Sequence, residues 1–254
     1  MRLNVWSMTE CGDVRQRNED SILAVIQEDD RCDAGIFVVA DGMGGLQFGD
    51  RVSNYITERF GIWWNRDFMQ LRNGEADTEE NVAELLDQEI WDINTALYRF
   101  KEENKCRAGS TLSLLLISRN RYLIRNMGDS RVYLFRRGSL QQLTEDQSLV
   151  AELVRGGEMT SQEARMSAKK NILTMCMGMF MKPQYIQHSG NVAHGDVFLL
   201  CSDGMHNQVD LYQMQKILGD YTLCGDEKLK KLRAAILPGT AADNISIIVV
   251  EAMD

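Results

Sequence analysis

Apolar residues recur along the chain in short runs that have the length and composition of β-strands. Valine, isoleucine, leucine and aromatic residues dominate these runs, and turn-forming or charged residues separate them. The pattern predicts strands over residues 2–8, 21–27, 35–40, 111–118, 121–127, 131–136, 184–189, 196–201 and 245–251. The pairs Arg119-Asn120 and Arg137-Gly138 are typical of tight turns between neighbouring strands. They predict an antiparallel meander in the middle of the chain.

Two longer segments, 48–70 and 79–101, instead carry apolar residues at helical spacing. Thr78, followed by two glutamates, is typical of a helix start. Shorter helices are predicted near residues 148–165, 208–218 and 226–236. We interpret the apolar helix faces as core faces. This order of elements predicts antiparallel sheet with helices on its outer faces.

Composition limits the classes of partner. A chain of 254 residues suits one large domain or two small ones. Its net charge of -9 disfavours nucleic acid and anionic membranes as partners, so we expect neither. A site for phosphate would therefore need strong local positive charge, which bound metal can supply.

Cysteine spacing and the apolar runs bear on the compartment. The six cysteines lack the short spacing of a zinc site or redox motif, and free thiols fit a reducing cytoplasm. The N-terminus has no apolar segment of signal-peptide type, and no apolar run is long enough to span a bilayer. We therefore expect a soluble, cytoplasmic protein.

Several aspartates stand at the ends of predicted strands. A single Asp-Gly pair is most often a simple turn. A carboxylate at the end of a buried strand is costly unless it is hydrogen-bonded, paired or metal-bound, and neighbouring carboxylates repel one another. With only three histidines in the chain, oxygen ligands favour magnesium, manganese or calcium over zinc. The aspartates in question are Asp41, Asp129, Asp203 and Asp243.

Seven short motifs occur in a fixed order along nearly the whole chain. They are 12–20 (GDVRQRNED), 39–45 (VADGMGG), 108–111 (AGST), 126–131 (NMGDSR), 143–149 (LTEDQSL), 200–204 (LCSDG) and 243–246 (DNIS). Each motif alone is weak, but their order is specific. Together they resemble the metal-dependent protein phosphatases of the protein phosphatase 2C family, in particular its compact bacterial members.

The resemblance implies both an architecture and an activity. The expected fold class is α+β, a four-layer α-β-β-α sandwich with two central antiparallel sheets flanked by helices. Residues 1–254 would form a single catalytic domain, with 148–182 as a mobile flap. The implied activity is hydrolysis of phosphoserine and phosphothreonine with two Mn²⁺ or Mg²⁺ ions, and with a third ion in some bacterial relatives. Two such ions lower the pKa of a water molecule shared between them, so that hydroxide is available near neutral pH.

Ligand roles follow from the same resemblance. The residue matching Asp41 bridges two metals, and the carbonyl oxygen matching Gly42 also binds metal. The residues matching Asp203 and Asp243 complete one of these sites. Asp129, together with Asp203, would hold a third metal.

Three further positions have roles around the metals. The residues matching Glu19 and Asp20 hold metal-associated water, and the residue matching Arg15 grips the substrate phosphate. An arginine fork matches phosphate geometry better than lysine does. Arg17 is a rival for this role, but the spacing to Glu19 favours Arg15.

The chain also departs from the family pattern. Met43 stands where animal relatives have a histidine thought to protonate the leaving group, so we expect metal-bound water to supply this proton. His206 is an alternative acid, although a surface position at a helix start is the favoured interpretation. Gln147 replaces the histidine usual after Asp146. The methionine-rich segment 166–181 is either core filler or a docking surface, and core filler is favoured.

Three other functions compete with this hypothesis. A non-catalytic, regulatory phosphoprotein-binding relative would have lost a metal carboxylate, and none is missing. A sporulation- or stress-type phosphatase usually carries extra sensor domains. A calcium-binding structural sandwich leaves Arg15 and the motif order unexplained. The expected partners are phosphorylated proteins, namely a Ser/Thr kinase and its substrates, and the expected state is a monomer.

Overall fold

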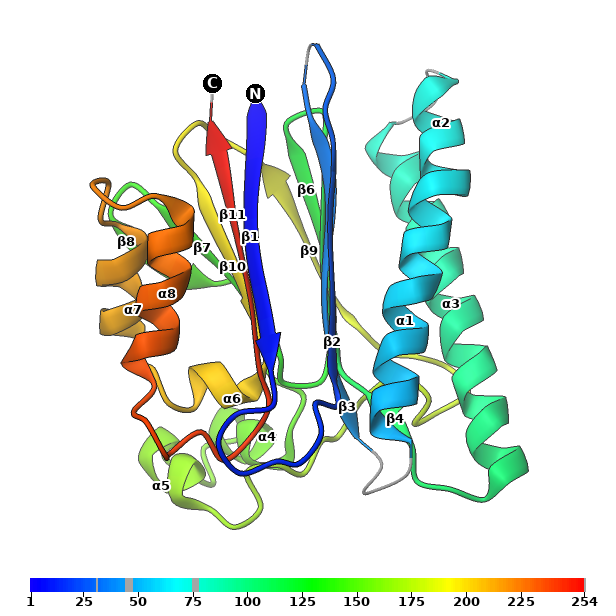
Figure 1. Ribbon diagram of the computed structural model, residues 1–254. Helices are drawn as coiled ribbons and strands as arrows, with labels where there is room; N and C mark the ends of the chain where they lie inside the picture. Colours follow the sequence, from blue (N-terminus) through cyan, green and yellow to red (C-terminus); the bar gives the residue numbers. More distant parts are fainter. Residues whose placement is uncertain (31, 44–47, 75–77, 254) are drawn as a thin grey trace.

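Two antiparallel sheets stack face to face between two layers of helices (Figure 1). The computed structural model describes residues 1–30, 32–43, 48–74 and 78–253. The layers confirm the predicted α-β-β-α sandwich. The strands are β1 (Arg2–Glu10), β2 (Asp20–Gln27), β3 (Ala34–Met43), β4 (Gly109–Ser110), β5 (Leu112–Ser118), β6 (Arg121–Met127), β7 (Arg131–Arg136), β8 (Ser139–Gln142), β9 (Ile186–Asn191), β10 (Val197–Cys201) and β11 (Ile245–Met253).

Each sheet has its own strand order. One sheet runs β1-β11-β10-β7-β8, and the other runs β2-β3-β5-β6-β9 with β4 paired to β3. The turn between β5 and β6 uses positive φ angles of 48° at Arg119 and 59° at Asn120. The turn between β7 and β8 uses 50° at Arg137 and 79° at Gly138. Both predicted tight turns are therefore confirmed.

Both faces of the second sheet are buried. In β3, Ile36 and Val38 face the helices, whereas Phe37 and Val39 face the other sheet. All four side chains are fully buried. A strand covered on both faces shows a continuous apolar run instead of alternation, which explains the pattern in the sequence.

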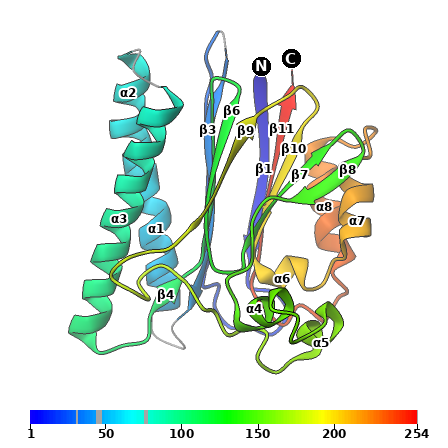
Figure 2. The same ribbon diagram turned by 180° about the vertical axis from the view of Figure 1, so that it is seen from behind.

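The helices form the two outer layers (Figures 1 and 2). The pair α1 and α3 covers the sheet of β3, and the pair α7 and α8 covers the sheet of β10. The part of the chain that the structure describes contains no helix long and apolar enough to cross a bilayer. The helices are α1 (Gly49–Trp63), α2 (Met69–Asn73), α3 (Glu79–Asn104), α4 (Leu149–Arg155), α5 (Ser161–Met166), α6 (Asp203–His206), α7 (Leu211–Leu218) and α8 (Gly225–Ala235), with a π-helical turn η1 (Trp64–Phe68) between α1 and α2.

Several boundaries differ from the prediction. The helical stretch expected near 148–165 is broken into α4 and α5, because Gly157 adopts a φ of 74° that stops a helix. The helix expected near 208–218 is preceded by the short α6, and Asp210 caps α7. Strands β4 and β8 were not predicted, since each is short and lacks a strong apolar pattern.

Candidate functional site

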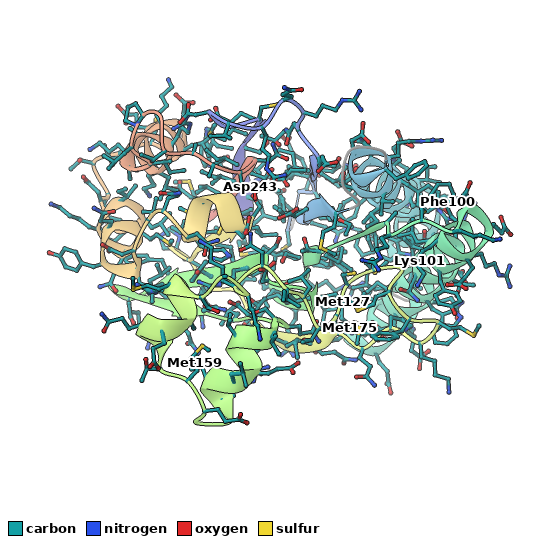
Figure 3. The ribbon with its side chains drawn as sticks, turned by 90° about the horizontal axis from the view of Figure 1, so that it is seen from below. Phe100, Lys101, Met127, Met159, Met175 and Asp243 are labelled. Carbon is teal, nitrogen blue, oxygen red and sulfur yellow. The ribbon has the colours of Figure 1, made fainter. Side chains whose placement is uncertain are left out.

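Aspartates from four strand termini gather at one edge of the sandwich, the lower end in Figure 1. Asp41 lies near the end of β3, and Asp20 begins β2 directly opposite Asp41 in the strand register. Asp203 follows β10, and Asp243 precedes β11. Figure 3 looks onto this edge and shows Asp243 beside α6. The predicted site residues are thus brought together from distant parts of the sequence.

Asp20 is buried and held by two serines. Its Oδ2 accepts hydrogen bonds from the hydroxyls of Ser202, at 2.8 Å, and Ser246, at 2.7 Å. Burial raises the pKa of Asp20 to about 7, although both hydrogen bonds lower it. Nearby Asp203 and Asp243 raise it further by repulsion. Asp20 is therefore fixed in place but electrostatically unsatisfied.

Asp203 is also buried, with an exposed fraction of 8%. Its Oδ2 accepts a hydrogen bond from Asn207 at 3.2 Å, whereas its buried Oδ1 has no hydrogen-bond partner. Burial, followed by repulsion from Asp243, raises the pKa of Asp203 to about 6. The positive charges of Lys170 and Arg15 act in the opposite direction. A buried oxygen without a partner is costly and suits a cation.

The same forces act on Asp41 and Asp129. Burial raises the pKa of Asp41 well above its usual value, and repulsion from Asp20, Asp203 and other acids adds to this. Burial also raises the pKa of Asp129 to about 8, with Asp203 the next cause. Burial and mutual repulsion at these carboxyls thus outweigh the positive charges of Lys170 and Arg15 beside Asp203 and of Arg131 beside Asp129. A cluster of this kind favours bound divalent metal, which would restore their ionised forms.

The backbone around Gly42 is packed too closely for a side chain. A Cβ at Gly42 would lie 2.2 Å from the carbonyl oxygen of Gly49 and 2.5 Å from that of Glu19. The N–H of Gly42 donates to the carbonyl oxygen of Glu19 at 3.1 Å. The Glu19 carboxylate in turn lies against Gly49, whose Cβ would be 2.6 Å from Oε1. Glu19 and the Gly42 backbone are therefore held side by side. Gly44 and Gly45 lie outside the described residues.

Asn244 organises the N-terminal part of the site, a role not predicted from the sequence. Its Oδ1 accepts the N–H of Glu19 at 2.8 Å. Its Nδ2 donates to the carbonyl oxygens of Cys11, at 3.0 Å, and Arg17, at 2.9 Å. Asn244 is buried and thereby fixes the loop that carries Arg15 and Glu19. In the sequence, only the position of Asn244 directly after Asp243 in the last motif pointed to a role at the site.

Arg15 reaches the acidic edge from this loop. Its Nη2 donates to Oδ2 of Asp243 at 2.8 Å, and the Arg15 side chain remains 47% exposed. The hydrogen bond to Asp243 raises the pKa of Arg15 above its ordinary value, so the guanidinium stays charged. Arg17 contributes its backbone carbonyl oxygen to Asn244. A charged and accessible fork beside the aspartates suits a phosphate ligand.

His206 is only partly exposed, and its ring turns inward. Its ring lies against the carbonyl oxygen of Asp129, with Nε2 at 2.9 Å, and its Nδ1 is buried without a hydrogen-bond partner. A carbonyl oxygen only accepts, so Nε2 carries the proton. Burial, followed by the positive charge of Arg131, lowers the pKa of His206 to about 3. The surface interpretation therefore holds only in part, because the residue is half-buried and its ring nitrogens face the protein.

The methionine-rich segment divides into two parts. Met177 is fully buried, and Met175 packs against the same core cluster, close to Met127 in Figure 3. Met166 and Met181 are exposed, by 83% and 60%. The interpretation as core filler therefore holds for the middle of the segment and is wrong for its ends.

The donor set fits hard divalent cations. It consists of carboxylate and carbonyl oxygens, and Asp203 Oδ1 has no other partner. Among the described residues, no three acidic, histidine or cysteine side chains surround a single point closely enough to form a complete metal site. Arg15 holds the Asp243 carboxylate, and Asn207 holds one oxygen of Asp203.

Comparison with known proteins decides the family. The family model described as protein phosphatase 2C matches residues 9–236. The chain belongs to the protein phosphatase 2C family. It is 33% identical over 245 residues to the serine/threonine phosphatase stp of Listeria welshimeri, covering 96% of this chain and 93% of that protein.

Solved structures of the family share the fold over nearly the whole chain. The serine/threonine phosphatase Stp1 of Staphylococcus aureus aligns with a TM-score of 0.86 and 25% identity, covering 100% of this chain and 96% of that chain. The catalytic domain of the phosphatase PstP, in complex with two manganese ions, aligns with a TM-score of 0.82 and 26% identity, covering 99% of each chain. The predicted membership of the 2C phosphatases is therefore confirmed.

Proposed function

We propose that the acidic edge is the active centre of this phosphatase and that Asp41, Asp203 and Asp243 bind two divalent metal ions. The chain is a protein-serine/threonine phosphatase that hydrolyses phosphate monoesters on proteins. The observation that carries the site assignment is the buried, unpartnered Oδ1 of Asp203 among mutually repelling carboxyls. Bound metals supply positive charge against the phosphate and lower the pKa of water.

The ions would be Mn²⁺ or Mg²⁺, because the donors are all oxygen atoms. The two manganese ions bound to the related PstP support a dinuclear centre. Asp41 would contact both ions, and the carbonyl oxygen of Gly42 would contact one of them. A third ion would use Asp129 and Asp203. Glu19 and Asp20 would orient water around the ions.

Arg15 would bind the substrate phosphate. Its guanidinium is charged and half-exposed, and it already lies 2.8 Å from a carboxylate oxygen of Asp243. Phosphate and carboxylate present similar oxygen geometry to an arginine fork. Arg15 would therefore orient the phosphate and offset charge on its oxygens as the ester bond breaks. His206 is neutral near pH 7 and is held by a backbone carbonyl, so we do not assign it as the proton donor.

The wider assignments extend the family expectation. Residues 1–254 would act as one catalytic domain, with 148–182 as its flap. The enzyme would work as a cytoplasmic monomer and oppose a bacterial Ser/Thr kinase, with the kinase and its targets as substrates. The free cysteines fit a reducing cytoplasm, and the net charge of -9 suits a protein that stays monomeric.

The test is hydrolysis of p-nitrophenyl phosphate and of a phosphothreonine peptide with Mn²⁺, with and without chelator. We expect chelator to abolish activity, and we expect Asp41→Asn and Asp203→Asn to reduce it severely. Circular dichroism of both variants serves as the folding control. Equal activity in parent and variants would overturn the assignment of the metal centre.

A further inference from the structure

Gln147 joins the flap, residues 148–182, to the turn that carries Asp129. The N–H of Gln147 donates to the carbonyl oxygen of Gly128 at 2.9 Å. The side-chain Oε1 of Gln147 accepts the N–H of Gly128 at 3.1 Å. Backbone and side chain of one residue therefore hold both polar groups of Gly128. This contact fixes the turn immediately before Asp129.

The same residue also holds the far end of the flap. The carbonyl oxygen of Gln147 accepts the N–H of Thr174 at 2.9 Å. Its side-chain Nε2 donates to the carbonyl oxygen of Gln184, just beyond the flap, at 3.2 Å. The flap therefore begins directly after Gln147, and the chain at and beyond its far end is hydrogen-bonded to the same residue.

Next to these contacts, the two backbone segments at the base of the flap pair with each other. Leu149 donates its N–H to the carbonyl oxygen of Ile172 at 2.8 Å, and Ser148 forms an isolated bridge with Leu173. Lys170 lies two residues before Ile172, and its positive charge acts on the carboxylate of Asp203. The position of the flap base therefore governs where this cation lies relative to the aspartate edge.

On its inner side, the turn is bonded to the strand that carries Asp41. Gly128 adopts a φ of 94°, and a Cβ there would lie 2.7 Å from the side chain of Thr111. Thr111 donates its N–H to the carbonyl oxygen of Asp41, and its Oγ1 accepts the N–H of Asp41, both at 2.9 Å. Its hydroxyl also contacts that of Ser130 at 2.8 Å. Polar and packing contacts thus run from Asp41 to the flap.

We infer that Gln147 is a positioning residue, which holds the flap over the aspartate edge by tying both flap ends to the turn that carries Asp129. Both atoms of its amide are used, one as acceptor and one as donor. A glutamate would place an oxygen against the carbonyl oxygen of Gln184, and a methionine would satisfy neither partner. A histidine, the usual family residue here, has one donor and one acceptor nitrogen when neutral. The catalytic consequence rests on the proposed function.

Amide hydrogen exchange measured by NMR tests this role without requiring any catalysis. In Gln147→Met and Gln147→Glu, the amides of Leu149 and Thr174 should exchange about tenfold faster, because one side-chain bond or more is lost. Gln147→His should keep the slow exchange. Gln215→Met is the matched control, since Gln215 also donates to a distant backbone carbonyl, that of Gly138, at 3.0 Å. It should leave the flap amides unchanged.

Kinetics give the second readout. In Gln147→Met, KM for a phosphothreonine peptide should rise about tenfold, while KM for p-nitrophenyl phosphate stays near the parent value because this small ester needs no flap contact. Unchanged exchange at Leu149 and Thr174, or equally faster exchange throughout β10, would overturn the inference. So would equal changes in KM for both substrates. If Gln147→Met does not fold, Gln147→Glu carries the test, since it keeps the acceptor for Gly128. If the parent protein itself hydrolyses neither substrate, that result would instead contradict the proposed function.

Discussion

The aspartates at the two ends of the sandwich differ in the partners that the protein supplies to their carboxylates. Asp33 immediately precedes β3 and Asp196 immediately precedes β10, at the end away from the candidate site. The same two strands deliver Asp41 and Asp203 at the other end. Each strand therefore has one aspartate near each terminus, and the two ends can be compared with the strand itself held constant.

At the far end, both Asp33 and Asp196 have strong partners. Asp196 is 1% exposed and accepts bonds from Arg136 at 2.7 and 2.6 Å and from the N–H of Ala193 at 2.7 Å. Asp33 accepts bonds from Arg2 and from the N–H of Leu3. Burial acts to raise the pKa of Asp33, but these bonds outweigh it and lower the pKa overall. These aspartates are structural.

At the candidate site, burial is similar but the partners differ. Asp203 has an unpartnered oxygen and lies near other acids, so its pKa rises to about 6. Burial alone therefore does not distinguish a structural carboxylate from a metal ligand. The distinguishing feature is whether positive charge and N–H donors are already supplied by the protein.

The largest expected effect is on catalysis by Asp203→Asn. We expect kcat/KM for the phosphothreonine peptide to fall about a thousandfold, because a charged metal ligand becomes neutral. Thermal stability of the metal-free variant should equal or exceed that of the parent, because repulsion is removed. A metal-free variant that melts well below the parent would show that Asp203 is instead a structural residue.

The matched change at the other end of β10 should have the reverse effect. We expect Asp196→Asn to lower the free energy of unfolding by about 2–3 kcal/mol, since Arg136 loses its charged partner. Its kcat/KM at a temperature well below unfolding should stay near the parent value. Urea denaturation and steady-state kinetics check the two statements. A severe loss of activity in folded Asp196→Asn would remove the distinction between the two ends.

The pH dependence of stability sharpens the comparison. Burial raises the pKa values of Asp20, Asp129 and Asp203 to about 7, 8 and 6, above the unfolded value of 3.8. The folded state then binds more protons than the unfolded state, so the metal-free protein should lose stability as pH rises from about 4 to 8. Asp33 acts oppositely, because its lowered pKa adds stability that is lost as the pH falls below its unfolded value.

Urea denaturation at several pH values, with chelator and with Mn²⁺, measures this effect. The slope between about pH 5 and pH 8 should flatten with Mn²⁺, since bound cation favours the ionised carboxylates. A metal-free protein whose stability increases steadily over this range would contradict the account of the acidic edge.

Among the substitutions at the candidate site, His206→Ala should have the smallest effect on catalysis. This histidine is neutral near pH 7, so its removal should leave kcat within about tenfold of the parent. Stability should fall by about 1 kcal/mol, because the hydrogen bond to the Asp129 carbonyl is lost. Hydrolysis assays and thermal melts check both. A loss of kcat beyond about a hundredfold would make His206 the proton donor.

The sequence predicts the strands and aspartates because these follow local patterns. The apolar run before Asp41 and the one before Asp203 predict buried strands that end in carboxylates. The motif order added the family and thereby the sandwich. None of this requires contacts between specific distant side chains.

The remaining features depend on long-range contacts. Asp20 is held by Ser202 and Ser246, which are 182 and 226 residues away. The burial of His206 requires the Asp129 turn to lie against α6. Gln147 looks like a simple departure from the family until its bonds to Gly128 and Gln184 are seen. Such contacts become visible only when the sheets are assembled.

Calorimetric titration of the metal-free protein with Mn²⁺ tests the central claim most directly. We expect binding of at least two ions per chain, weakened or reduced in number in Asp203→Asn and unchanged in Asp196→Asn. Absence of Mn²⁺ binding to the parent, or the same stoichiometry and affinity in parent and Asp203→Asn, would contradict the account.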